Sequence, residues 1–429
     1  MPRKKAEPKT TTRNKKVGDQ DFLKGLAADT GGQMMCDMGQ SRYFIDTGNL
    51  ALNRILSGKY IGGGLPGGQI TEVYGPPASA KSLLGNCVLG AVQRMGGIAV
   101  YLDCERAGNP DFAKNAGHVD IEKLISYEPI SIEECERKIR VAVEKINEHY
   151  GIEIPKLFVW DSISVVPTER EWKVAELPEN ATKEAIKAAG GNERPGERAR
   201  AAGDMLRRLN PLLNDANASL YVINQTRMKI GVLWGSPETT GGGGKALPFY
   251  ASCRIRTSAS GFIKDKFKVP CGVQLNFENK KNRSWRPFGK VEKVDLFFDK
   301  GINPLGGLLT SLRYAERIVG PSNWTVQEPW ANGETVKFKA ALEADMPEEI
   351  LLRCPSLIDA KDEREVKEYL DTWRGAINLS EEQMAVEAVK DENVDAIKQT
   401  DIIAELGLES EFDDSTYSPE DEMAETKSD

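Results

Sequence analysis

A short segment near residue 80 combines residue types that suit phosphate binding. The sequence Gly75-Pro-Pro-Ala-Ser-Ala-Lys81-Ser82 matches the pattern G-x-x-x-x-G-K-[ST], except that Ala80 occupies the position of the second glycine. In this pattern, backbone N–H groups at a helix N-terminus surround phosphate oxygens, a lysine meets the β- and γ-phosphate charges, and a hydroxyl binds magnesium. The segment therefore predicts a site for ATP and Mg²⁺, and a glycine-poor turn that only imitates the pattern is the alternative. The residues expected to hold the nucleotide here are Gly75, Pro76, Pro77, Ala78, Ser79, Ala80, Lys81, Ser82 and Leu83.

Two acidic residues follow apolar runs that resemble buried strands. Asp161 comes directly after Leu157–Trp160, and Glu105 follows Ile98–Leu102 by three positions. A carboxylate at the tip of a strand beside a phosphate loop can hold magnesium, so Asp161 is expected to share that ion with the Ser82 hydroxyl. Glu105 is then the candidate base that deprotonates the water attacking the γ-phosphate. Each carboxylate could instead cap the helix that follows it.

The elements that must position these residues alternate along the chain. Short apolar strands are predicted at 69–74, 98–102, 157–160 and 220–223, and a helix with apolar residues at helical spacing follows the phosphate loop. Ser131-Ile-Glu-Glu134 is a capping box that opens a further amphipathic helix. This βαβ rhythm predicts an α/β fold with a mostly parallel twisted sheet, helices on both faces, and ligands at its carboxyl edge.

Later segments differ from this pattern. Apolar and polar residues alternate around Cys253 and Leu275, which predicts half-buried, antiparallel strands added to the sheet, with one more candidate at 294–298. From about Gly301 the chain is charged and rich in helix-forming residues, and it contains Trp324, Trp330 and Trp373. We interpret it as a smaller, α-rich C-terminal domain.

Composition excludes several classes of protein. The 429 residues carry 57 Lys and Arg against 65 Asp and Glu, a formal charge of −8, and no stretch approaches the length of a membrane span. Seven cysteines without a C-x-x-C pair suggest neither a disulfide framework nor a zinc site, and with only two histidines imidazole chemistry is improbable. The basic N-terminus has no apolar stretch behind it, which excludes a secretory signal peptide. We expect a cytoplasmic protein without a membrane partner.

Charge is concentrated at the two ends of the chain. Residues 1–16 are strongly basic, whereas 401–429 are acidic with Lys427 as their only base. Such runs are usually solvated and disordered, although either could serve as an interaction arm. The expected organisation is a basic arm (1–33), a core that carries the phosphate loop (34–300), a C-terminal domain (301–400) and an acidic disordered tail (401–429).

Several segments, in order, resemble RecA-type recombinases, and the chain looks like a bacteriophage member of the UvsX/RecA group. The segments that carry this resemblance span about residues 40–305 and are 45–48, 64–67, the phosphate loop, 103–105, 223–231, 235–240, 249–252 and 301–303. The resemblance implies an ATP-dependent recombinase with a RecA-like P-loop core that hydrolyses ATP and binds DNA (34–300) and an oligomerisation helix in the basic arm (1–33). Such a protein forms a helical filament on single-stranded DNA and pairs it with a homologous duplex.

The resemblance also implies roles for individual residues. Glu105 matches the family's catalytic glutamate, Gln225 its γ-phosphate sensor, and Phe112 the aromatic residue that stacks on adenine, with Asn109 near the base. Phe112 could instead be a core residue of its helix. Lys281 and Arg283 match a pair of cations that reach the γ-phosphate of the neighbouring subunit, although two surface bases at a strand end would look the same.

The segment from Arg227 to Gly244 corresponds to the family's second DNA-binding loop. Its cations can contact phosphates, its Trp and apolar residues can stack between bases, and its glycines allow the loop to order on binding. A solvated flexible loop is the alternative. The expected DNA contacts are Arg227, Met228, Lys229, Ile230, Trp234, Thr239, Thr240, Gly241, Gly242 and Gly243. The first DNA-binding loop is expected between Pro167 and Gly196, without individual contacts.

Two other functions share parts of this pattern. A ring-forming helicase or translocase would share the phosphate loop and the carboxylates, but it would have no reason to carry the segment from Gln225 to Gly244. A protein that coats single-stranded DNA and uses ATP only for assembly is the other alternative, and Glu105 argues against it. The recombinase interpretation adds further expected partners, namely a single-stranded-DNA-binding protein and loading mediators. It also implies association with the nucleoid, in the cytoplasm of the bacterial host if the protein is viral.

Overall fold

The computed structural model describes residues 20–32, 41–178, 180–188, 196–228, 238–342 and 344–373. The chain divides into two units, one that ends at Arg42 and one that begins at Tyr43. In the first unit the described element is the helix α1 (Gln20–Asp29), which buries none of its residues within the unit. The basic segment 1–16 and the acidic tail 401–429 lie outside the described residues.

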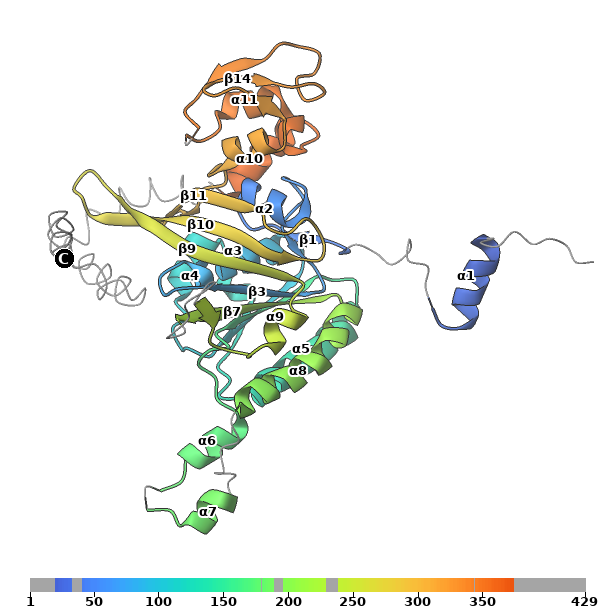
Figure 1. Cartoon of the computed structure of the whole chain (residues 1–429), viewed down its shortest axis with the longest axis vertical. Coiled ribbons are helices and arrows are strands. Elements are labelled where there is room, and N and C mark those ends of the chain that lie inside the picture. Colours follow the sequence, from blue (N-terminus) through green and yellow to red (C-terminus); the bar gives the residue numbers. More distant parts are fainter. Residues whose placement is uncertain are drawn as a thin grey trace, which may run out of the picture. The chain divides into compact units, whose positions relative to one another are not determined.

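A ten-stranded sheet forms the centre of the second unit (Figure 1). Its strands lie in the order β12-β11-β10-β9-β3-β7-β6-β4-β5, and β8 pairs with β7. Neighbours from β9 to β5 run parallel, whereas β10, β11, β12 and β8 are antiparallel to their partners. The strands are β3 (Ile70–Gly75), β4 (Ile98–Asp103), β5 (Leu124–Tyr127), β6 (Lys156–Asp161), β7 (Ala218–Met228), β8 (Glu238–Thr240), β9 (Cys253–Lys264), β10 (Pro270–Asn282), β11 (Lys290–Phe297) and β12 (Gly301–Ile302).

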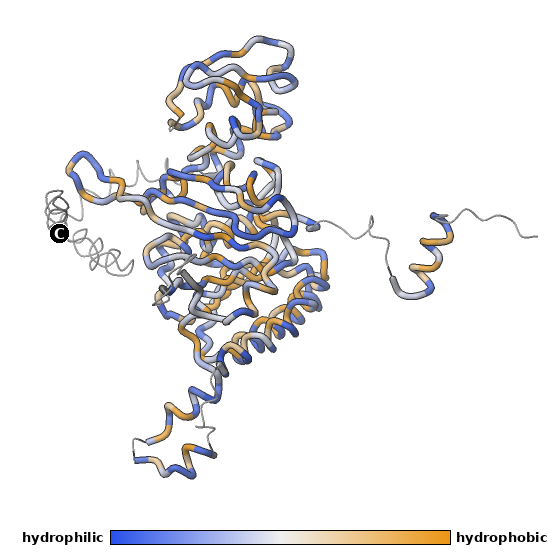
Figure 2. The backbone as a smooth tube through the Cα atoms, in the orientation of Figure 1, coloured by the Kyte–Doolittle hydropathy of each residue, from blue (hydrophilic) through white to orange (hydrophobic). Residues whose placement is uncertain are grey.

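Helices cover both faces of this sheet, because its central strands are apolar on both sides. In β6, Leu157 and Val159 join one buried cluster, whereas the alternating Phe158 and Trp160 join another. The first cluster includes residues of α2 (Leu50–Ser57), α3 (Lys81–Arg94) and α4 (Pro110–Gly117). The second includes residues of α5 (Ile132–Tyr150), α8 (Glu197–Asp215) and α9 (Ala246–Tyr250). Apolar and polar segments alternate along α5 and α8 (Figure 2).

The predicted fold class and its strands are confirmed. The four runs predicted as parallel strands correspond to β3, β4, β6 and β7, and the alternating segments correspond to β9, β10 and β11. These three strands pair antiparallel with one another as predicted, but β9 also pairs with β3 in parallel. The predicted capping box also begins a helix, since the Ser131 side chain accepts a hydrogen bond from the Glu134 amide (3.1 Å). Local sequence patterns therefore predicted seven of the ten strands of this sheet, whereas β5, β8 and β12 were not predicted.

Smaller elements complete the connections. The strands β1 (Phe44–Ile45) and β2 (Leu65–Pro66), which flank α2 in the chain, pair antiparallel before β3, and the turn η1 (Ile121–Lys123) precedes β5. Two short helices, α6 (Glu169–Ala175) and α7 (Lys183–Ala188), lie between β6 and α8, in the segment expected to hold the first DNA-binding loop (Figure 1).

The region after Gly301 differs from the α-rich domain predicted from its composition. It contains α10 (Leu308–Tyr314), α11 (Glu348–Arg353), the turn η2 (Pro355–Ile358) and a helical segment at 363–373. It also contains a three-stranded antiparallel sheet of β13 (Ile318–Val319), β14 (Asn323–Val326) and β15 (Lys337–Lys339). These strands were missed because each has only two to four residues, too few to show an alternating pattern.

Two of the three tryptophans named above for this region are buried and hydrogen-bonded. Trp324 is buried in β14 and donates from Nε1 to the Ala340 carbonyl oxygen (2.9 Å). Trp373 is buried in the cluster that includes residues of α2, α3 and α4, and it donates from Nε1 to Asp46 Oδ2 (3.1 Å). Within the described ranges, no helix combines the length and the apolar character needed to cross a membrane.

Candidate nucleotide and DNA site

The phosphate-loop sequence lies between β3 and α3, as its pattern predicts. Gly75 ends β3, and a Cβ atom there would lie 2.3 Å from the Thr257 carbonyl oxygen, so only glycine fits. Ala78 and Ala80 both adopt left-handed backbone conformations, with φ of 55° and 57°. Glycine usually supplies this conformation, which explains why the pattern has a glycine where this chain has Ala80. The loop thus keeps its conformation without that glycine, at some cost in strain.

Lys81 is buried at the start of α3, and no carboxylate of the described residues lies within hydrogen-bonding distance of it. Its Nζ donates to the Pro76 carbonyl oxygen (2.6 Å) and lies 3.5 Å from Ser79 Oγ. Burial lowers the pKa of Lys81 to about 8, against the opposing influence of Asp161 and Glu105. A buried ammonium group held by neutral oxygens is suited to meet an anion that enters the loop.

Asp161, at the end of β6, faces the start of α3. It is 5% exposed and accepts hydrogen bonds from the Tyr101 hydroxyl (3.0 Å at Oδ2) and from the Ser82 side chain. Burial raises the pKa of Asp161 to about 6, an effect that the nearby Glu105 strengthens. Burial and the neighbouring carboxylates also raise the pKa of Tyr101, so its hydroxyl stays protonated and can donate. Asp161 therefore carries an unfavourable charge near neutral pH, which a cation beside it would stabilise.

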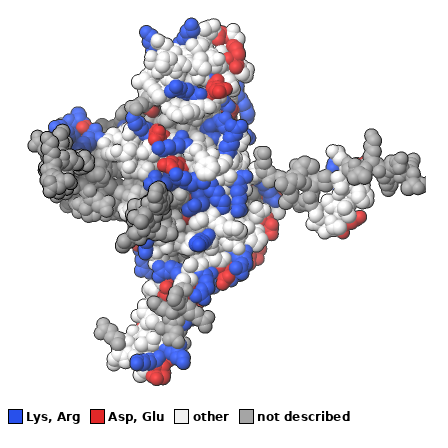
Figure 3. Space-filling model, in the orientation of Figure 1, with Lys and Arg blue, Asp and Glu red and all other residues white. Residues whose placement is uncertain are grey.

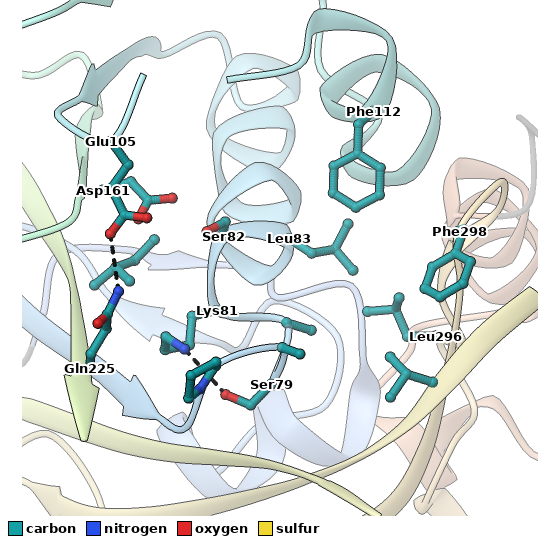
Figure 4. Close-up of a pocket in the computed structure, with 15 residues that line it drawn as sticks. Ser79, Lys81, Ser82, Leu83, Glu105, Phe112, Asp161, Gln225, Leu296 and Phe298 are labelled. Carbon is teal, nitrogen blue, oxygen red and sulfur yellow. Dashed lines mark hydrogen bonds between the residues drawn. The ribbon is translucent and has the colours of Figure 1, made fainter. Parts of the chain in front are cut away.

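Glu105 lies in the same pocket and contacts two polar side chains. Its Oε1 accepts hydrogen bonds from the Ser162 hydroxyl and from Gln225 Nε2, the latter at 3.3 Å (Figure 4). Gln225 sits in β7, opposite the Gly75 end of β3. The parallel strands β4, β6 and β7 thus bring Glu105, Asp161 and Gln225 together at one edge of the sheet, as the sequence predicts.

An apolar wall closes the other side of the pocket. The cavity has a volume of about 210 Å³, and Phe112, Leu296 and Phe298 line it opposite the carboxylates (Figure 4). Phe112 also packs against the core cluster below, so both roles considered for it are compatible. Asn109 caps α4 instead of lining the cavity, because its Oδ1 accepts a hydrogen bond from the Phe112 amide (3.0 Å). Its expected contact with a nucleotide base is thus limited to groups that the cap leaves free.

The segment expected to bind DNA begins as a β-hairpin. β8 pairs antiparallel with the end of β7, where Arg227 lies opposite Thr239 and Met228 opposite Glu238. Thr240 ends β8, while Lys229, Ile230 and Trp234 lie outside the described residues. One arm of this hairpin, β7, also carries Gln225. The segment expected to bind DNA is therefore continuous with a strand that lines the pocket.

The glycines at the base of this hairpin differ in exposure. Gly241 is exposed, and its amide donates to the Gln225 carbonyl oxygen (2.8 Å). Gly242 and Gly243 are buried, and a Cβ atom on Gly242 would lie 2.7 Å from Ile163 Cγ2. Their expected role as DNA contacts therefore changes to a structural one, since their backbone is packed inside the protein.

Asn224 fixes this base to the sheet from a fully buried position. Its Nδ2 donates to Glu72 Oε1 (2.9 Å) and to the Gly242 carbonyl oxygen (3.0 Å). Its Oδ1 accepts hydrogen bonds from the Gly242 amide (2.9 Å) and the Ser164 hydroxyl (2.9 Å). All four bonds hold the hairpin base and the strand end as one rigid piece.

Comparison with known proteins identifies the family. The family model described as the RecA N-terminal domain matches residues 16–303. The chain belongs to the RecA family. The chain is 34% identical over 269 residues to the curated "Protein RecA" of Mesorhizobium japonicum, a match that covers 62% of this chain and 65% of that protein. It is equally similar to "Protein RecA" of a Chelativorans species, over 66% of that protein, and of Brucella canis, over 65%. The matches thus span slightly less than two thirds of these RecA proteins.

The two cations expected to act on a neighbouring subunit lie away from the pocket of their own chain. Lys281 Nζ donates to the carbonyl oxygens of Pro248 (2.7 Å) and Phe249 (2.9 Å), and Arg283 Nη2 donates to that of Phe249 (3.1 Å). Cys253, which lies next to the two cations in the sheet, pairs with Thr71 of β3. Thr71 lies four residues before Gly75, where the phosphate loop begins, and four strand residues span about 13 Å. Neither cation lines the pocket of its own subunit in this RecA-family chain.

Some residues of the site were not foreseen from the sequence. Tyr101 and Ser162, which hold the two carboxylates, could have been found, because they lie within two residues of Asp103 and Asp161 on predicted strands. The residues of the apolar wall gave no such signal.

Figure 3 shows Lys and Arg side chains spread over the viewed face of the second unit, in the region of β9 and β10 and along α8. The net charge of the chain did not reveal this distribution. Among the described residues, no cluster of three or more His, Cys, Asp or Glu side chains could hold a metal on its own.

Proposed function

We propose that this chain is an ATP-dependent DNA recombinase, which forms helical filaments on single-stranded DNA and catalyses homologous pairing and strand exchange. The observation that carries the proposal is the hydrogen bond between Gln225 and Glu105 (3.3 Å). It joins the candidate base of ATP hydrolysis to the strand that continues into the DNA-binding hairpin. Membership of the RecA family supports the same function.

The residues of the pocket suit ATP with Mg²⁺. Lys81 would meet the phosphate charge, and Ser82 with Asp161 would hold the ion, which when bound neutralises charge on the phosphates. Glu105 would take the proton from the attacking water, while Ser162 and Gln225 fix its carboxylate. Phe112 would pack against adenine within the apolar wall. A buried cation without a carboxylate partner and a carboxylate with a raised pKa fit this pair of ligands well.

Filament formation would complete this pocket with residues from the next subunit. Lys281 and Arg283 are held by carbonyl oxygens of α9 and do not line the pocket of their own subunit, so we infer that they reach the phosphate of a neighbour. Hydrolysis would then depend on assembly, in the manner of an arginine finger. The arm at 1–33 would dock onto the adjacent subunit, and the C-terminal domain would gate the entry of duplex DNA.

DNA would bind along the hairpin between β7 and β8. Arg227 and Lys229 would contact phosphates, and Trp234 with Met228 and Ile230 would stack on or between bases. We further propose the bacterial cytoplasm, at the nucleoid, as the place of action. We also propose that the chain is related to the phage UvsX group. Its proposed partners include a single-stranded-DNA-binding protein and loading mediators.

A strand-exchange assay based on fluorescence energy transfer tests the function. The full chain is incubated with ATP, Mg²⁺ and single-stranded DNA, and then with a labelled duplex that is either homologous or heterologous. We expect exchange with the homologous duplex alone. Displacement regardless of homology would instead indicate a helicase, and DNA-stimulated hydrolysis without displacement would indicate a DNA-coating protein. Lys81→Ala is the control, because it should abolish ATP hydrolysis and exchange together.

A further inference from the structure

Two cysteine side chains meet directly beside the candidate base. Cys104 follows β4 and is partly exposed, whereas Cys135 is buried in the first turns of α5. Their Sγ atoms lie 3.8 Å apart, which is van der Waals contact. The sequence separates them by 31 positions, so only the fold brings the two thiols together.

The backbone of Cys104 is also connected to both residues that carry the carboxylates of the pocket. It immediately precedes Glu105, and its amide donates to the Asp161 carbonyl oxygen (2.7 Å). A change in the Cys104 backbone must therefore be felt by Glu105 and by the end of β6. Cys135, by contrast, lies in a 19-residue helix that is packed into one of the two core clusters of the sheet.

We propose that Cys104 and Cys135 form a reversible disulfide when a two-electron thiol oxidant is present, and that this disulfide stops ATP hydrolysis by displacing Glu105. The inference rests on the proposed ATPase function of the pocket. In the reaction the exposed Cys104 thiol adds across the N=N bond of an azodicarboxamide such as diamide. The Cys135 sulfur then attacks Cys104 Sγ and expels the reduced hydrazine, so the oxidant takes up two electrons and two protons in total.

The displacement follows from bond geometry. A disulfide needs the sulfurs about 2.05 Å apart, so the present 3.8 Å must shorten by roughly 1.7 Å. Because α5 is long and packed, we expect the connection between β4 and α4, which carries Cys104 and Glu105, to make most of this movement. A misplacement of about 1 Å in a catalytic group can reduce the rate about 100-fold. The phosphate loop itself is not cross-linked, so nucleotide binding should change little.

The test uses the full chain, oxidised with diamide and then treated with dithiothreitol. Peptide mapping by mass spectrometry under non-reducing conditions should find the Cys104 and Cys135 peptides joined. We expect kcat for ATP hydrolysis to fall about 100-fold, a fluorescent ATP analogue to bind within threefold of its original affinity, and dithiothreitol to restore kcat. Unfolding would abolish binding as well, so the two readouts separate displacement from damage.

Matched variants assign the effect to this pair. Cys104→Ser should hydrolyse ATP normally and resist diamide, whereas Cys271→Ser, which removes another partly exposed thiol, should remain sensitive. The inference is overturned if the two peptides are not joined after oxidation, or if they are joined and kcat is unchanged. A reduced chain that hydrolyses no ATP would instead refute the proposed function, while the peptide map would still show whether the disulfide forms.

Discussion

The substitution Asp161→Asn should make the nucleotide-free protein more stable while abolishing Mg²⁺-dependent ATP hydrolysis. Burial raises the pKa of Asp161 from its ordinary value of 3.8 to about 6. At roughly 1.36 kcal/mol for each pKa unit, this rise corresponds to about 3 kcal/mol of unfavourable free energy for the ionised side chain. Asparagine carries no charge, and its amide oxygen can still accept the hydrogen bond from the Tyr101 hydroxyl.

The pH dependence gives this prediction its sign. Because the folded pKa lies above the unfolded one, the folded protein holds the proton more tightly, and stability falls as pH rises from about 4 to about 6. The gain from Asp161→Asn should therefore be close to zero below pH 4 and reach about 3 kcal/mol above pH 6.

Urea denaturation of both proteins at several pH values, without nucleotide, measures this gain. Asp103→Asn is the matched control, because Asp103 accepts hydrogen bonds from the amides of Ala107 (3.2 Å) and Gly108 (2.9 Å). Replacing one of its oxygens by an NH₂ group should destabilise the protein by about 1 kcal/mol. A loss of stability for Asp161→Asn at pH 7.5, or a gain that does not vary with pH, would refute the reasoning.

Three further predictions concern other parts of the chain. Ala80→Gly should stabilise the protein by about 0.5–1 kcal/mol in denaturant unfolding, because relief of left-handed strain exceeds the added entropy of the unfolded chain. The control Ala91→Gly, inside α3, should destabilise the protein. Equal losses of unfolding free energy in the two variants would contradict this prediction. By itself, a double Lys281→Ala, Arg283→Ala variant should lose DNA-stimulated ATP hydrolysis. Mixed with Lys81→Ala subunits, which keep both cations, it should regain part of this activity, and no regain would argue against cations supplied by a neighbour. Truncation after Thr400 should strengthen duplex-DNA binding and alter its salt dependence, since the acidic tail would otherwise compete for the cations; unchanged binding would make the tail a solubilising segment.

The phosphate loop and the acidic strand ends could be predicted because their signals are local. The loop residues are contiguous, so their spacing alone fixes a strand, a turn and a helix around them. Glu105 and Asp161 are far apart in sequence, but each follows an apolar run. Parallel strands in a βαβ series present their carboxyl ends at one edge, which was enough to place both residues in one pocket.

The apolar wall could not be predicted, because it depends on strand order. Leu296 and Phe298 follow the phosphate loop by more than 200 residues, and their alternation indicates a strand without indicating its neighbours. Only the antiparallel extension of the sheet beyond β9 brings them to the pocket. The buried glycines have the same explanation. A glycine run looks mobile in sequence, and nothing local shows that Ile163 and Asn224 enclose Gly242.

The contrast between Asn224 and Gln225 bears on how DNA binding would influence hydrolysis. Successive residues of a strand face opposite sides, so Asn224 points into the core while Gln225 points into the pocket. Four hydrogen bonds hold the Asn224 side chain and the start of the turn after β8 rigidly. Among the described residues, the Gln225 side-chain amide makes one hydrogen bond, of 3.3 Å, to Glu105. An effect of DNA binding at the hairpin on Glu105, the candidate catalytic base, therefore would not require β7 to move. Reorientation of the Gln225 side chain would be sufficient, because that side chain already contacts Glu105, the carboxylate proposed to activate water.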